Sequence, residues 1–122
     1  MDNYLIDTSI IIACLRGYKD EVNHTEKLLE QGAGLGCCSI IITEIFAGLR
    51  EKEKNKTETF INSLKFYPVT RDIAKLAGEY IRNYSKKGMT LSLADATVGA
   101  VTNAYKLKLL TYNKKHYPML FK

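Results

Sequence analysis

Three acidic residues, Asp7, Glu44 and Asp95, lie far apart in the chain but occupy similar places relative to its apolar segments and expected helices. Each follows an apolar or strand-like segment and stands near the start of an expected helix. If the strands form a parallel sheet, all three belong to its carboxyl edge, where ligands of open α/β sheets bind. Carboxylates gathered there repel one another unless a cation is bound, and hard oxygen ligands suit Mg²⁺ or Mn²⁺. Such an ion lowers the pKa of a bound water and neutralises charge on a phosphoryl group, so these residues indicate metal-dependent phosphoryl chemistry.

Each acid also has a purely structural interpretation, which the sequence leaves open. Asp7 is a favoured capping residue, since a carboxylate near a helix N-terminus gains from the helix dipole. Glu44 fits an ordinary first-turn residue at the edge of an apolar stripe. Asp95 fits a capping box that begins at Ser92, with Asp in place of the usual Glu. Gly48, within a helical pattern, favours the close approach of a ligand or another backbone near Glu44.

The composition is that of a folded protein in a reducing compartment. With 122 residues, 46% of them hydrophobic and 25% charged, the chain can bury a core as one domain over residues 1–122. The formal charge of +5 favours an acidic partner such as nucleic acid without requiring one. Cys14, Cys37 and Cys38 form no C-x-x-C pair, which excludes a typical zinc site and favours buried thiols. No apolar run reaches the roughly 18 residues of a membrane span, and no signal peptide is evident, so we expect a soluble cytoplasmic protein.

Strand and helix patterns alternate along the chain. The apolar run from Tyr4 to Ile6 predicts a buried strand, and Thr8 and Ser9 are the expected N-caps of a helix that ends near Gly17. Further helices are expected over residues 19–31, from Ser39 to Leu49, and over 71–86 and 92–105. Further strands are expected at 36–38, within 65–69, at 107–111 and, as a short extended segment, at 119–121. This alternation predicts an α/β fold, a three-layer α/β/α sandwich with a short, mostly parallel central sheet.

Three finer expectations concern the surfaces of these elements. The GAGLG segment, residues 32–36, is typical of a turn. The charged segment 51–56 is expected to be an exposed helix end or a tight connection between helices. The inner faces of the second and third helices are expected to carry Val22, Leu28, Leu29, Ile41, Ile45, Phe46 and Leu49.

Four segments, in order along nearly the full chain, resemble the PIN domain, and within it the VapC-type toxins. They are DTS at 7–9, TEIFAGL at 43–49, LSLADATVGA at 91–100 and LLTYNKKHY at 109–117. The resemblance implies a ribonuclease that uses one or two Mg²⁺ or Mn²⁺ ions to hydrolyse RNA phosphodiester bonds. It also implies a homodimer and a cognate antitoxin protein that inserts an acidic or Arg-bearing segment into the active groove.

The same resemblance implies roles for individual residues. Asp7, Glu44 and Asp95 correspond to the metal-site acids. The supporting polar groups, which orient acids and water, would be Thr8 or Ser9, Thr111 and Asn113. Asn113 has an alternative, because Asn in such a turn often bonds the local backbone.

His116 departs from the family pattern. Many members carry a fourth acid at this place in an N-x-x-D/E-F segment, whereas this chain has His116 followed by Tyr117. The change leaves open whether a second metal ion binds, since neutral imidazole is a poor ligand for Mg²⁺ and a better one for Mn²⁺. His116 could instead contact phosphate, act as a general acid toward the leaving oxygen, or be an ordinary surface residue.

Basic residues near the expected site are candidates for RNA binding. Lys114 and Lys115 flank it in sequence, and Lys87 precedes the helix of Asp95. Converging lysines hold a phosphate backbone, but lysines in turns are also commonly just solvated.

Two classes of function therefore compete. The leading hypothesis is a metal-dependent endoribonuclease, and the alternative is a PIN-like module that binds RNA or protein with weakened catalysis. A phosphotransfer protein with Asp7 as the covalent acceptor is disfavoured, because the segment around Asp7 offers neither a second acid nor a lysine for the phosphate.

Overall fold

The computed structural model describes residues 2–121 and contains a four-stranded parallel sheet. Its strands are β1 (Asn3–Ile6), β2 (Gly34–Cys38), β3 (Lys65–Tyr67) and β4 (Lys108–Leu110), in the order β3-β2-β1-β4. Leu5 on β1 is opposite Gly36 on β2 and Leu109 on β4. Because all neighbours are parallel, the carboxyl ends of the strands share one edge.

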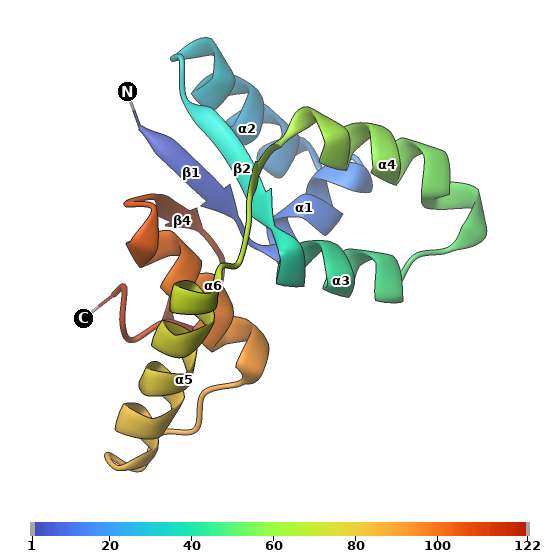
Figure 1. Cartoon of the computed structure of the whole chain (residues 1–122). Coiled ribbons are helices and arrows are strands. Elements are labelled where there is room, and N and C mark those ends of the chain that lie inside the picture. The colour runs from blue at the N-terminus through green and yellow to red at the C-terminus, as the bar shows by residue number, and fades with distance from the viewer. Residues whose placement is uncertain (1, 122) are drawn as a thin grey trace.

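Six α-helices connect and cover these strands. They are α1 (Thr8–Leu15), α2 (Lys19–Glu30), α3 (Ser39–Ala47), α4 (Lys54–Ser63), α5 (Arg71–Ser85) and α6 (Leu93–Ala104). Two short 3₁₀ turns, η1 (Glu51–Glu53) and η2 (Lys114–His116), complete the described elements. Helices α1 and α2 lie on one side of the sheet and α5 and α6 on the other, while α3 and α4 extend beyond it (Figure 1). The predicted three-layer α/β/α fold is confirmed.

The core is centred on β1, which lies between β2 and β4. Leu5 and Ile6 are fully buried, as are Ile11 on α1, Ile41 on α3 and Val101 on α6. Each such side chain contributes about 1.5–3 kcal/mol by its burial. The strand that ends at Asp7 is therefore held firmly from both faces.

The glycine-rich segment is a strand for most of its length, so the predicted turn over 32–36 is wrong beyond its start. Gly32 has a positive φ of 85° and makes the turn, but β2 already begins at Gly34. A Cβ at Gly36 would overlap the Tyr67 ring and lie 2.8 Å from the Lys65 carbonyl oxygen. Glycine is needed here because β3 and its side chains approach the backbone closely.

Other differences arise from tertiary contacts. Residues 119–121 form no strand, because the N–H groups of Leu120 and Phe121 bond back to the Tyr117 carbonyl at 2.9 and 3.0 Å. Leu29 is exposed, since Thr25 and Leu28 take the buried positions of α2. On α3 the buried stripe is Ile41 and Ile45 alone; Phe46 is half-buried, and Leu49 lies beyond the end of the helix.

The remaining expectations about surfaces and thiols hold. The charged segment 51–56 forms η1 and the start of α4, an exposed connection as predicted. Cys14, Cys37 and Cys38 are free and buried, and burial raises the pKa of the Cys37 thiol to about 11. Across residues 2–121, no helix combines the length and apolar character needed to cross a membrane.

Candidate active site

Asp7 stands where β1 meets α1 and is itself the N-cap residue. Its N–H extends the ladder by bonding the Leu110 carbonyl at 2.9 Å, and its Oδ1 accepts the Thr8 N–H at 2.8 Å. The expectation that Thr8 and Ser9 would cap the helix is therefore wrong. Because Asp7 keeps an extended backbone, the helix already begins at Thr8.

The second carboxylate oxygen of Asp7 is held by two hydroxyl groups. Thr111, just after β4, donates to Oδ2 at 2.8 Å, and Tyr117 donates to the same atom at 3.1 Å. Asp7 is only 8% exposed. All of its hydrogen-bond donors among residues 2–121 are neutral, so this buried carboxylate has no Lys or Arg to balance its charge there.

Glu44 is connected to the same end of the sheet through Thr8. The Thr8 hydroxyl donates to Glu44 Oε1 at 2.7 Å. Glu44 is exposed and lies in the second half of α3, so the alternative interpretation of it as an ordinary first-turn residue is wrong. The bond joins α1 and α3 directly beside Asp7.

Asp95 lies in the first turn of α6. Its N–H donates to the Ser92 hydroxyl at 3.0 Å, which is the Ser half of the expected capping box. Its Oδ2 lies 3.5 Å from His116 Nδ1, so its carboxylate faces the η2 turn. α6 follows α5 through a loop, so the expectation that Asp95 follows a strand is wrong. Helix α3 packs against both α1 and α6, which makes the helices of the three acids neighbours.

Tyr117 is a site residue that the sequence interpretation left without a role. It is 1% exposed, and its hydroxyl lies beside both Asp7 and Asp95. Burial, and then the charges of Asp7 and Asp95, raise its pKa well above the usual range, so the phenol keeps its proton. One signal was available: Tyr stands where the N-x-x-D/E-F pattern has Phe, which adds a hydroxyl to a core position.

The other expected supporting residues are placed differently. The buried Oγ of Ser9 has no hydrogen-bond partner among the described residues. Asn113 is exposed and bonds through its backbone, since its N–H donates to Thr111 Oγ1 at 3.0 Å. Thr111 thus links the η2 turn to Asp7.

The three candidate lysines are exposed and do not share a partner. The Lys114 ammonium lies 5.4 Å from the centre of the Phe121 ring, and that of Lys87 lies 5.2 Å from the Tyr84 ring. Lys115 lies on η2 beside His116. Lys114 and Lys115 therefore lie at the edge of the candidate site, whereas Lys87 contacts the Tyr84 ring of its own segment.

The donor atoms suit a hard divalent cation, but the side chains do not surround one as they stand. In the described part of the chain, no three His, Cys, Asp or Glu side chains are close enough together to hold a metal ion. The acids are connected instead through hydroxyl groups and His116. Carboxylate and hydroxyl oxygens are the ligand types of Mg²⁺ and Mn²⁺, and a buried carboxylate without a basic partner favours a bound cation. Glu44 and Asp95, both partly exposed, would have to turn toward Asp7 to complete such a site.

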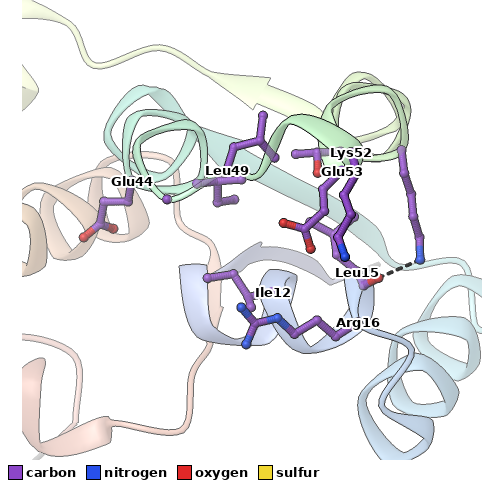
Figure 2. A pocket seen from close by; sticks show the side chains of 11 residues that line it. Ile12, Leu15, Arg16, Glu44, Leu49, Lys52 and Glu53 are labelled. Atoms are coloured by element: carbon purple, nitrogen blue, oxygen red, sulfur yellow. Dashed lines mark hydrogen bonds between the residues drawn. The ribbon is translucent and has the colours of Figure 1, made fainter.

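A groove of about 270 Å³ adjoins these acids at Glu44 and runs between α1, α3 and α4. Figure 2 shows Ile12 and Leu15 of α1, and Arg16 just after that helix, along one wall, and Glu44 at the end away from Lys52 and Glu53. The ammonium of Lys56 bonds the Leu15 carbonyl at 2.7 Å across the far end. Asp7 and Asp95 do not line this groove, so it borders the candidate site without containing it.

Known proteins resemble this chain over almost its whole length. The family model of the PIN domain matches residues 4–119. Ribonuclease VapC19 of Mycobacterium tuberculosis is 30% identical over 115 residues, covering 94% of this chain and 92% of that protein. In the structure of VapBC2 from Rickettsia felis bound to a promoter DNA fragment, the similar chain superposes with a TM-score of 0.83 at 20% identity, covering 97% and 95% of the two chains. A DNA-bound VapBC from Salmonella typhimurium also reaches 0.83, at 17% identity, over 99% and 94%.

The two VapBC structures share the fold of this chain, and the PIN-domain model and the VapC19 ribonuclease match it over almost its whole length. The chain therefore belongs to the PIN-domain family, and within it to the VapC type.

Proposed function

We propose that this protein is a divalent-metal-dependent endoribonuclease, the toxin of a toxin–antitoxin pair, and that it hydrolyses RNA phosphodiester bonds. The observation that carries the proposal is the setting of Asp7, a buried carboxylate held by neutral donors at the carboxyl edge of the sheet. Thr8 connects this position to Glu44, and Tyr117 donates to Asp7 while the charge of Asp95 also acts on its hydroxyl. The relatives named ribonuclease support the class of reaction.

In this proposal Asp7, Glu44 and Asp95 hold Mg²⁺ or Mn²⁺. The ion, when bound, supplies Lewis acidity toward water and the phosphoryl group. The hydroxyls of Thr8 and Thr111 fix the two acids that they contact. The Ser9 hydroxyl, which has no hydrogen-bond partner among residues 2–121, and the Asn113 side chain are available to orient water.

His116 is proposed as the residue that handles a proton on the leaving oxygen. Asp95 beside Nδ1 leaves Nε2 as the atom that can donate. An alternative role for the same ring is a contact with a substrate phosphate. Lys114 and Lys115, adjacent to His116, and Lys87 would contact the RNA backbone, which positions the strand without selecting its sequence.

The partner proposed for the chain is a cognate antitoxin, and its docking place is the groove beside Glu44. Solved structures of similar chains are VapBC and FitAB assemblies, which supports a partner of this kind. The groove combines apolar side chains with the basic Arg16 and Lys52 and the acidic Glu44 and Glu53, so it suits an amphipathic segment that carries acidic or Arg side chains. A homodimer and a cytoplasmic location complete the proposal, and light scattering of the purified chain tests the dimer.

The deciding experiment compares the wild-type protein with Asp7→Asn on a mixed RNA substrate. We expect cleavage by the wild type with added Mg²⁺ or Mn²⁺, none with a chelator, and none by the folded variant. Sequencing the RNA ends would then identify the bond that is cut. Undiminished cleavage by Asp7→Asn would contradict the assignment.

A second candidate function is a PIN-like module that binds RNA or protein with weakened catalysis. Two observations favour it: the acids do not surround a metal position as they stand, and His116 replaces an acid of the family pattern. Calorimetric titration with Mn²⁺ separates the two candidates. Absence of binding, together with intact RNA binding, would support the module.

A further inference from the structure

The Tyr117 hydroxyl is a polar group inside the core of the protein. The side chain is 1% exposed and is the largest of the fully buried side chains of the described residues. Burying a hydroxyl without a partner is unfavourable, and this one donates to Asp7 Oδ2 at 3.1 Å. A Phe ring would fill the same space and would need no hydrogen-bond partner. Packing alone therefore does not explain why this residue carries a hydroxyl.

The two carboxylate oxygens of Asp7 accept different numbers of hydrogen bonds. An ionised carboxylate has about four acceptor positions, two on each oxygen. Oδ2 accepts two hydroxyl protons, from Thr111 and Tyr117, and both of its positions are used. Among residues 2–121, Oδ1 accepts only the Thr8 N–H, which leaves one of its two positions open there.

We propose that Tyr117 is a positioning residue: with Thr111 it holds Oδ2 of Asp7, so that Oδ1 alone is presented to a metal ion. The inference rests on the proposed metal-dependent function and adds to it a residue and the oxygen through which Asp7 binds. The donors come from different places, since Thr111 follows β4 and Tyr117 follows η2. Together they prevent rotation of the carboxylate about its Cβ–Cγ bond.

The Tyr117 hydroxyl also lies near a second acid, Asp95, whose charge acts on it together with that of Asp7. It donates to Asp7, whose carboxylate is thereby held before an ion binds. A metal ion that joins Asp7 and Asp95 therefore enters a site in which one of the acids is already oriented. Groups that orient metal ligands in this way typically change metal affinity by about 10–100-fold when they are removed.

The experiment measures Mn²⁺ binding by calorimetry on chelator-treated wild type, Tyr117→Phe and Tyr105→Phe. We expect Tyr117→Phe to bind Mn²⁺ at least about 10-fold more weakly. Tyr105→Phe is the matched control, because it also removes one phenolic hydroxyl, whose partner is the Pro68 carbonyl at 2.8 Å. Its affinity should stay within about twofold of wild type, a change well below the one expected for a group that orients a metal ligand. Circular dichroism of both variants verifies that the fold is retained.

A double variant tests whether the two hydroxyls act on the same oxygen. Thr111→Val removes the other donor to Oδ2, so the loss of affinity in the double variant should be smaller than the product of the two single losses. Wild-type protein that binds no Mn²⁺ would overturn the proposed function and this inference together. Wild type that binds Mn²⁺ and a Tyr117→Phe variant that binds it equally well would overturn the inference alone, as would fully multiplicative losses.

Discussion

Thr8 donates its hydroxyl proton to Glu44 Oε1 over 2.7 Å, and this one bond connects the helix that Asp7 caps to the helix that carries Glu44. The two residues are 36 positions apart in the chain. The carboxylate of Glu44 is exposed, so without this bond its orientation depends on solvent alone. The hydroxyl therefore fixes the carboxylate of Glu44 at the N-terminal end of α1, the helix that Asp7 caps.

Replacing Thr8 with Val should lower RNA cleavage more than it lowers stability. The side chain keeps its shape and β-branching but loses the proton given to Glu44, so we expect activity to fall by about 10–100-fold. Because the bond is exposed, the free energy of unfolding should fall by no more than about 1 kcal/mol. Cleavage rates and denaturant unfolding check the two effects.

Thr59→Val is the control for this substitution. Thr59 lies on α4, and its hydroxyl also makes one exposed bond, to the Asn55 carbonyl at 3.0 Å. It should leave cleavage unchanged. Equal losses in the two variants would mean that Thr8 acts only through general stability.

A divalent cation should stabilise the folded protein through the acids. A ligand that binds only the native state adds about 2.7 kcal/mol at 100 times its dissociation constant. We therefore expect the unfolding midpoint of wild type to rise with added Mn²⁺ and to return after chelation. Asp7→Asn should show no such rise. A rise of the same size in Asp7→Asn would indicate binding elsewhere on the protein.

Elements whose sequence pattern is local are predictable from the sequence. The apolar run before Asp7 and the helical spacing of Ile73 and Ala77 on α5 depend on near neighbours, so β1 and the long helices were predicted within a few residues. The prediction of a turn over residues 32–36 failed because glycine usually marks a turn, whereas Gly36 is required by the approach of Tyr67 from the next strand.

The candidate site shows the same contrast between features that near neighbours encode and contacts that join residues far apart in the chain. The three acids could be named from their places after apolar segments and from family resemblance. The bond from Tyr117 to Asp7 joins residues 110 positions apart, and no periodicity within either segment encodes it. The same holds for the contact of His116 with Asp95. The partners that orient a site could therefore be found only in the folded chain.

Stability should decrease at alkaline pH because buried thiols cannot ionise easily. The pKa of Cys37 is about 11 in the folded protein, against a reference value of 9.0. Above pH 9 the unfolded chain loses this proton while the folded chain keeps it, so the folded state binds more protons and stability falls as pH rises from 9 to 11. Unfolding by denaturant across this range measures the slope.

Cys37→Ala tests the origin of that slope. The variant loses some stability at every pH through its smaller side chain, but its decline between pH 9 and 11 should be shallower than that of wild type. The neighbouring buried thiol of Cys38, whose pKa is also raised, should preserve part of the decline. Identical slopes would assign the decline to other groups.

Two glycines should respond to alanine in opposite directions, which tests how closely β2 and β3 pack. At Gly36 the added methyl group meets the Tyr67 ring and the Lys65 carbonyl, so Gly36→Ala should cost about 1–3 kcal/mol of unfolding free energy. Gly78 lies in the middle of α5, and apart from its chain neighbours and the backbone of its own helix no atom of the described residues lies within 4 Å of its ideal Cβ. Gly78→Ala should stabilise the protein by about 0.5–1 kcal/mol, since alanine favours the helix. Chemical denaturation measures both values, and a neutral Gly36→Ala would show that the sheet can open at β3 without loss. Because Cys38, the last residue of β2, is followed directly by the helix of Glu44, such an opening would also loosen the acid that Thr8 orients.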